Sequence, residues 1–331
     1  MNGVPLRIVD APESGQGSVS ADFPAPVLKL AFASLVRARA LADAVTPLRA
    51  PGVAAVPPCD EIGDAVAVGA ALASVPEDFL YPAPGDAITG WMRGMPPEVV
   101  AIQASRGGPS SRRMAGLVGS SESRVVPAIA GVGSRVLTAL GSALAVRATT
   151  GAAVVCSLGA RAAVRGSLAT AWRTAVAVRA PLVILVRPGV SLPDEAGGAD
   201  PGPPLAVETL RASTITVDGG DVLAVAAGCR SALEEARRGD GPAILVVAES
   251  EGSPLSRLEG FLRDRHGFAE SELSAVAREA KAEVARAFAA AGDRSDPPDF
   301  ESIFDDVLSV TPASLLEQRR LGSTGSTEYA P

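Results

Sequence analysis

The side chains able to act as nucleophiles are few and lie far apart in the sequence. The only histidine is His266, so a serine–histidine pair would have to include it. No Gly-x-Ser-x-Gly motif surrounds Ser157, Ser253 or the pair Ser110 and Ser111. The sequence therefore predicts no serine-nucleophile chemistry, and it places His266 at the surface or at a helix end.

The three cysteines, Cys59, Cys156 and Cys229, are widely spaced, odd in number and without metal-ligand spacing. We interpret them as packed free thiols in a protein of the reducing cytoplasm. The Gly-x-Gly at residues 131–133 does not extend to a dinucleotide-binding GxGxxG fingerprint.

Composition argues against nucleic acid and membrane as partners. The 331 residues carry a net charge of −7, and no Lys/Arg cluster of the kind that nucleic acid requires is present in the sequence. The best candidate for a membrane span, residues 125–146, contains Arg135 at its middle. A central arginine costs about 2.5–3.5 kcal/mol on insertion. We therefore expect a buried helix in a soluble protein.

Buried strands alternate with helices in the second half of the chain, which predicts an α/β fold with a parallel sheet and helices on both faces. The predicted strands cover residues 152–156, 182–186, 213–217 and 243–247. A helix at 134–146 precedes the first strand, and helices at 166–178 and 221–238 lie between later ones.

Helical segments precede and follow this unit. They are predicted at residues 27–45 and 62–73, and at 255–264, 270–291 and 299–308. Residues 105–123 and 189–204 are expected to be loops. The sequence thus predicts one domain over residues 26–309, with tails at 1–25 and 310–331.

The sequence predicts a turn, a capped helix and a helix end within residues 217–250, VDGGDVLAVAAGCRSALEEARRGDGPAILVVAES. Gly219 and Gly220 form the turn, Asp221 caps the helix, and the glycines at 239 and 241 end it. The segment resembles the alpha subunits of pyruvate and branched-chain 2-oxo acid dehydrogenases. Residues 61–72 (EIGDAVAVGAAL) and 256–307 are similar to the same family. The resemblance implies the thiamine-diphosphate-binding fold.

In that family the alpha subunit holds the cofactor diphosphate through Mg²⁺, using the Asp of a Gly-Asp-Gly motif and a later Asn-Asn. The resemblance places Gly159, Ala160 and Arg161 at the first motif, and Pro188 and Gly189 at the second. Neither replacement offers a side-chain oxygen, whereas Mg²⁺ needs oxygen ligands.

Two further family motifs are also altered. The family's Tyr-Arg-x-His-Gly corresponds to residues 84–88 (PGDAI), and its catalytic His-Ser loop corresponds to residues 250–254 (SEGSP). We therefore expect no catalytic residue, no metal and no thiamine diphosphate. Because Arg161 and Arg187 flank the altered motifs, a hypothesis is that they bind a phosphate-bearing ligand without metal. The alternative is that each arginine pairs with an acid or reaches solvent.

Three functions remain open. The first is a non-catalytic alpha-like subunit, as a homodimer or as a heterotetramer with a beta-like chain, assembled through the helices at residues 134–145 and 166–178. The second is an active subunit whose missing ligands come from a partner. The third is a scaffold or regulator that uses the loop carrying Arg106, Arg112 and Arg113.

Overall fold

The computed structural model describes residues 23–48, 58–105, 118–127, 132–149, 151–159, 166–187, 214–292 and 310–323. The strands are β1 (Phe79–Tyr81), β2 (Val154–Gly159), β3 (Leu182–Arg187), β4 (Thr214–Asp218) and β5 (Ala243–Ala248). The helices are α1 (Ala25–Val45), α2 (Glu61–Ala73), α3 (Ile88–Met92), α4 (Pro97–Ser105), α5 (Val132–Thr149), α6 (Gly166–Ala177), α8 (Val222–Arg237), α9 (Pro254–His266), α10 (Glu270–Ala291) and α11 (Ala313–Ser323). A 3-10 turn, η2 (Thr46–Leu48), follows α1.

The five strands form one parallel sheet in the order β1-β2-β3-β5-β4. All six residues of β3 are buried, as expected of a strand covered on both faces. The central strands are continuous apolar runs in the sequence because neither face of such a strand is in contact with water. The predicted α/β fold with helices on both faces is confirmed.

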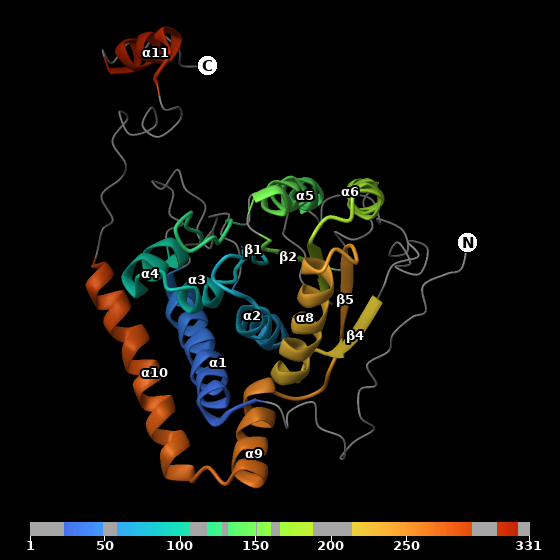
Figure 1. Cartoon of the computed structure of the whole chain (residues 1–331). Helices are drawn as coiled ribbons and strands as arrows, with labels where there is room; N and C mark the ends of the chain where they lie inside the picture. The colour runs from blue at the N-terminus through green and yellow to red at the C-terminus, as the bar shows by residue number, and fades with distance from the viewer. Residues whose placement is uncertain are drawn as a thin grey trace.

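The side chains of β3 show which helices cover each face. Leu182, Ile184 and Val186 belong to a core shared with α5 and α6, whereas Val183 and Leu185 belong to a core shared with α2 and α8. Figure 1 shows α5 and α6 together on one side of the sheet, with α2 and α8 on the other. Arg187, the next residue in this alternation, is therefore directed to the α2 side.

Helices α2 and α8 pack closely because α2 contains a glycine at the contact. A Cβ atom added to Gly69 would lie 2.6 Å from Cγ1 of Val225. Helix α8 begins as predicted: the side chain of Asp221 accepts hydrogen bonds from the backbone N–H groups of Leu223 and Ala224.

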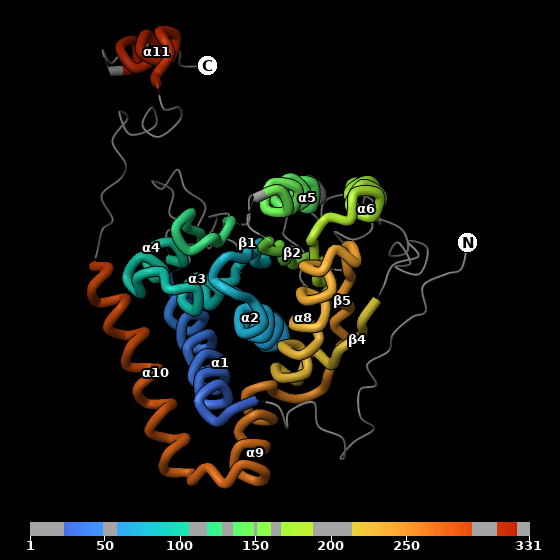
Figure 2. The backbone as a smooth tube through the Cα atoms, viewed as in Figure 1, coloured from blue at the N-terminus to red at the C-terminus, as the bar shows by residue number. Residues whose placement is uncertain are grey.

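Helices α1, α9 and α10 form an additional layer over α2 and α8. In Figure 2, α10 runs alongside α1, and the two share a hydrophobic core with α9. Ion pairs between Arg37 and Glu283 and between Lys29 and Glu272 connect α1 to α10. The helices predicted at residues 27–45, 255–264 and 270–291 are confirmed, with shifts of a few residues at most.

Several elements differ from the prediction or were missed. Strand β2 begins and ends later than the predicted 152–156, and it includes Ser157 and Leu158, which are buried and pair with β3. Strand β1 has only three residues, too few to show a periodicity, and α3 and α4 were not predicted. Helix α11 lies within the segment predicted as a tail, and both views draw it apart from the sheet. Residues 106–117 of the loop predicted at 105–123, the loop predicted at 189–204 and the helix predicted at 299–308 lie outside the described residues.

The candidate membrane segment is part of this fold. Residues 132–146 belong to α5, which covers the sheet, and Arg135 is buried. Over the described ranges, no helix combines the length and the apolar character that a membrane span requires.

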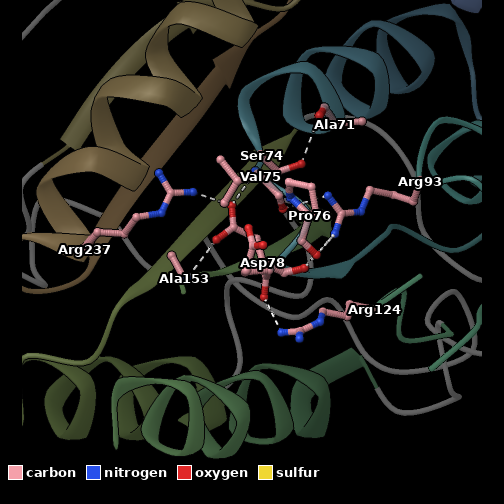
Figure 3. A network of polar contacts seen from close by, with 10 residues as sticks. Ala71, Ser74, Val75, Pro76, Asp78, Arg93, Arg124, Ala153 and Arg237 are labelled. Atoms are coloured by element: carbon pink, nitrogen blue, oxygen red, sulfur yellow. Dashed lines mark hydrogen bonds and ion pairs between the residues drawn. The ribbon is translucent and has the colours of Figure 1, made fainter. Parts of the chain in front are cut away.

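A buried carboxylate joins several elements at the amino end of the sheet. Asp78, just before β1, is 0% exposed. Its carboxylate accepts hydrogen bonds from the backbone N–H groups of Val75 and Ala153, each 2.9 Å away, and pairs with Arg237 at the end of α8. Its carbonyl oxygen accepts from Arg93, which also binds the carbonyls of residues 75 and 76 (Figure 3).

Candidate functional site

The carboxyl ends of β2 and β3 lie next to each other, with Gly159 paired to Arg187 in the sheet register. In open α/β sheets, ligands bind beyond the carboxyl ends of the strands. We call this region the carboxyl edge and define it by Gly159, Arg187, the residues before and at the start of α2, and the turn after β1.

Arg187 is the largest side chain buried at this edge, with 2% of its surface exposed. Its guanidinium lies against the first turn of α2, and a Cβ atom added to Gly63 would overlap its Nη1 atom. Glycine at position 63 therefore makes the space that the guanidinium occupies.

The contacts of this guanidinium are weak for a buried charge. Nη1 is 3.9 Å from Oδ1 of Asp60, a carboxylate oxygen that accepts a hydrogen bond from the Gly63 N–H at 2.6 Å and so caps α2. The neighbouring Cys59 is neutral, because burial raises the pKa of its thiol to about 12. Among the described residues, Nε of Arg187 has no hydrogen-bond partner.

A second buried arginine and a buried aspartate belong to the same region. Arg135 of α5 donates to the carbonyl oxygens of Pro82 and Ser157, the latter at 3.3 Å. Both carboxylate oxygens of Asp86 accept from Thr89, one from the backbone N–H at 3.0 Å and one from the hydroxyl at 2.6 Å. Burial raises the pKa of Asp86, although Thr89 and both nearby guanidinium groups oppose this effect.

An apolar pocket lies beside this cluster, between α1, α2 and α3. Asp64 lines it together with Cys59 and small side chains of α1, and the Asp64 carboxylate pairs with Arg39. Burial raises the pKa of Asp64 to about 8, against the opposing effect of Arg39. The pocket thus has one ionisable group whose charge changes near neutral pH.

Asp64 is expected to make stability depend on pH. Its folded pKa of about 8 exceeds the ordinary 3.8, so between these values the folded chain binds a proton that the unfolded chain releases. Stability should therefore fall as pH rises through this window, by up to about 1.4 kcal/mol per unit. Urea unfolding at pH 5, 6, 7 and 8 should show a flatter dependence in Asp64→Asn than in the natural chain. Parallel curves for the two proteins would contradict the assignment.

Of the residues singled out in the sequence, Gly159 and Arg187 lie at the carboxyl edge, whereas Ala160, Arg161, Pro188 and Gly189 lie outside the described residues. His266 is exposed at the end of α9, with its ring 4.9 Å from that of Phe261. Ser253 precedes the other end of this helix, about 20 Å away at 1.5 Å per residue. The two side chains therefore form no catalytic pair.

The three cysteines are buried and free, as predicted. Sequence reasoning missed Arg135, Asp60 and Asp64 as members of a polar cluster. A charged residue within an apolar helix was the available signal for Arg135 and Asp64. Asp60 carried the weaker signal of an acid just before a helix.

The sheet order, the helices on both faces and the polar cluster at the carboxyl edge define an α/β protein of the class that binds ligands beyond its parallel strands. The family model of the dehydrogenase E1 component matches residues 52–249. The chain belongs to this family, which confirms the resemblance to the alpha-type component of 2-oxo acid dehydrogenases, and its fold is the thiamine-diphosphate-binding α/β fold. A search of curated proteins finds no match.

The described residues of the edge do not fit magnesium-bound diphosphate, the form in which the family holds its cofactor. Magnesium needs oxygen ligands in octahedral geometry, yet both oxygens of Asp86 bind Thr89 and an oxygen of Asp60 caps α2. The described ranges contain no group of three or more His, Cys, Asp or Glu side chains that could hold a metal ion. The buried guanidinium of Arg187 adds a positive charge that would repel the cation.

Proposed function

We propose that the chain is a non-catalytic, alpha-type component of a 2-oxo acid dehydrogenase assembly that has lost the magnesium and thiamine diphosphate site. The observation that carries the proposal is the guanidinium of Arg187, buried at the end of β3 beside the start of α2. The resemblance described above supports it, because Ala160 and Pro188 stand at the positions where that resemblance implies metal ligands.

Assembly with a beta-like chain is the second part of the proposal, as a heterotetramer of two alpha-like and two beta-like chains, with a homodimer as the simpler form. The outer surfaces of α5 and α6 carry Leu137, Leu144 and Val176, whose exposed fractions are 42%, 36% and 47%. Leu137 and Leu144 are seven residues apart and share one helix face. A partner covering this face would remove their apolar surface from water.

The reducing cytoplasm suits this component, because three free thiols are packed in its interior. Native mass spectrometry of the protein purified from its own host tests the assembly. We expect two copies together with two beta-like chains, or two copies alone, and no bound thiamine diphosphate. A monomer that does not bind beta-like chains would contradict the proposed assembly. Bound thiamine diphosphate would contradict the proposed loss of the cofactor site.

Metal dependence gives a second test, which is independent of the partner. Ligand at 100 times its Kd stabilises a folded protein by about 2.7 kcal/mol. Two samples with thiamine diphosphate are compared, one with Mg²⁺ and one with EDTA in its place. We expect the same Tm in both, because the oxygen ligands for Mg²⁺ are missing. A further rise in Tm with Mg²⁺, together with decarboxylation of a 2-oxo acid, would identify an active subunit.

A further inference from the structure

We propose, on the basis of the assembly proposed above, that the outer face of α5 and α6 binds the beta-like chain through an apolar surface bordered by acidic residues. Three features of the chain point to this contact. They are the one-sided charge of the two helices, the exposed apolar side chains next to the charges, and the unequal covering of the two faces of the sheet.

Basic residues in this part of the chain are not balanced by acids. Residues 123–193 contain eight arginines and neither aspartate nor glutamate, although the whole chain has a net charge of −7. Three of these arginines are exposed: Arg147 in α5, Arg173 in α6 and Arg179 just after α6. The two helices therefore present a positive surface on a chain that is negative overall.

These three arginines have no acidic partner within the described ranges. Arg147 donates a hydrogen bond to the carbonyl oxygen of Val178, and none of the three takes part in an ion pair there. Several exposed arginines elsewhere do form ion pairs, namely Arg238 with Asp240, Arg263 with Asp264 and Arg286 with Glu279. A partner with acidic residues would therefore supply the counter-charges that this face lacks.

Apolar side chains adjoin the charges. Leu144 is three residues before Arg147 on α5, and Val176 is three residues after Arg173 on α6, so each pair lies on one side of its helix. Gly141 is exposed between Leu137 and Leu144, and nothing lies within 4 Å of a Cβ atom placed there. A partner side chain can thus reach the backbone of α5 while it covers the two leucines.

The two faces of the sheet are covered to different depths. On one face, α2 and α8 lie beneath the further layer of α1, α9 and α10. On the other face, Figure 1 shows no described helix packed over the outer side of α5 and α6. A second chain on this side would provide the outer layer that the opposite face has within the chain itself.

Other occupants fit this face less well than an acidic protein. A twofold contact between two copies would bring the same arginines together at one interface, where like charges repel. Nucleic acid would leave the exposed leucines without apolar contacts. Helices that lie in a membrane surface commonly insert aromatic side chains, whereas Trp172, the one aromatic residue in the sequences of α5 and α6, is buried.

The salt dependence of the assembly tests the charge of the partner. The assembly is purified from its own host, the beta-like chain is identified by its mass, and analytical ultracentrifugation measures the Kd. We expect the Kd to be at least about tenfold higher at about 500 mM than at about 50 mM sodium chloride, because salt screens charges at the rim of an interface. An unchanged Kd overturns the acidic surface and leaves the assembly standing. Two copies without a beta-like chain overturn this inference alone, and a monomer overturns the assembly as well.

Two variants of the full-length chain locate the contact. Arg173→Glu should slow association with the purified beta-like chain about tenfold at low salt. Leu137→Ala should speed dissociation at least about fivefold, because it removes apolar surface from the middle of the contact. The matched controls are Arg238→Glu, the same reversal at an exposed arginine after α8, and Leu30→Ala, at a leucine of α1 that is 46% exposed. Both controls should bind like the natural chain.

Two results would overturn the location or the occupant. If folded Arg173→Glu and Leu137→Ala bound the beta-like chain like their controls, the contact would lie on another face. If the natural chain bound vesicles of phosphatidylserine and phosphatidylcholine but not the beta-like chain, the face would be a membrane-binding surface.

Discussion

Replacing Asp78 with asparagine is expected to lower the free energy of unfolding by about 3–5 kcal/mol, the cost of removing one partner from a buried ion pair. The carboxylate receives Arg237 and two backbone N–H groups while fully buried. Asparagine keeps the volume but has a single acceptor oxygen, so Arg237 loses its counter-charge and at least one N–H group loses its acceptor. Urea unfolding of the purified chain measures the difference.

The matched control is Asp240→Asn, in which the same change is made in an exposed pair with Arg238. Exposed ion pairs contribute little, so we expect no measurable loss of stability. If Asp78→Asn were equally harmless, Asp78 would not be the residue that joins β1, β2 and α8 at the amino end of the sheet.

Gly69→Ala is expected to destabilise the protein by about 2 kcal/mol, although alanine is the better helix former by about 1 kcal/mol. The added methyl group would lie 2.6 Å from Cγ1 of Val225, so α2 and α8 would have to move apart. Because the side chains of both helices share a core with β3 and β5, that movement disturbs the packing on one whole face of the sheet.

Gly260→Ala in α9 is the control for this substitution. Nothing lies within 4 Å of a Cβ atom at position 260, so only the helix preference changes and stability should rise by about 1 kcal/mol. Changes of the same sign in the two variants would show that close approach of α2 and α8 does not determine the effect at Gly69. Thermal unfolding of both proteins side by side gives the comparison.

The central part of the fold could be predicted from sequence because the signal was local. Strands β3 and β5 are apolar runs, and β4 alternates threonine with isoleucine and valine before Gly219. The cap of α8 needs only Asp221 and the two residues before it. Strand β1 could not be found in this way. Its three residues become a strand by pairing with β2, which lies more than seventy residues later in the chain.

The candidate site was predictable only in part. The resemblance directed attention to Gly159 and Arg187, and the structure brings these two together. The roles of Ala160, Arg161, Pro188 and Gly189 stay predictions. The position of Arg135 depends on how α5 approaches the sheet, because its carbonyl partners Pro82 and Ser157 are distant in the sequence and no local pattern encodes them. Asp86, in contrast, binds Thr89 only three residues later.

The mutual fit of Gly63 and Arg187 limits the order in which the chain could change during evolution. A larger residue at position 63 is incompatible with the guanidinium, so the glycine had to be present before the arginine could be buried there. In the same way, Arg187 would have to be lost before a larger residue could be accommodated at position 63.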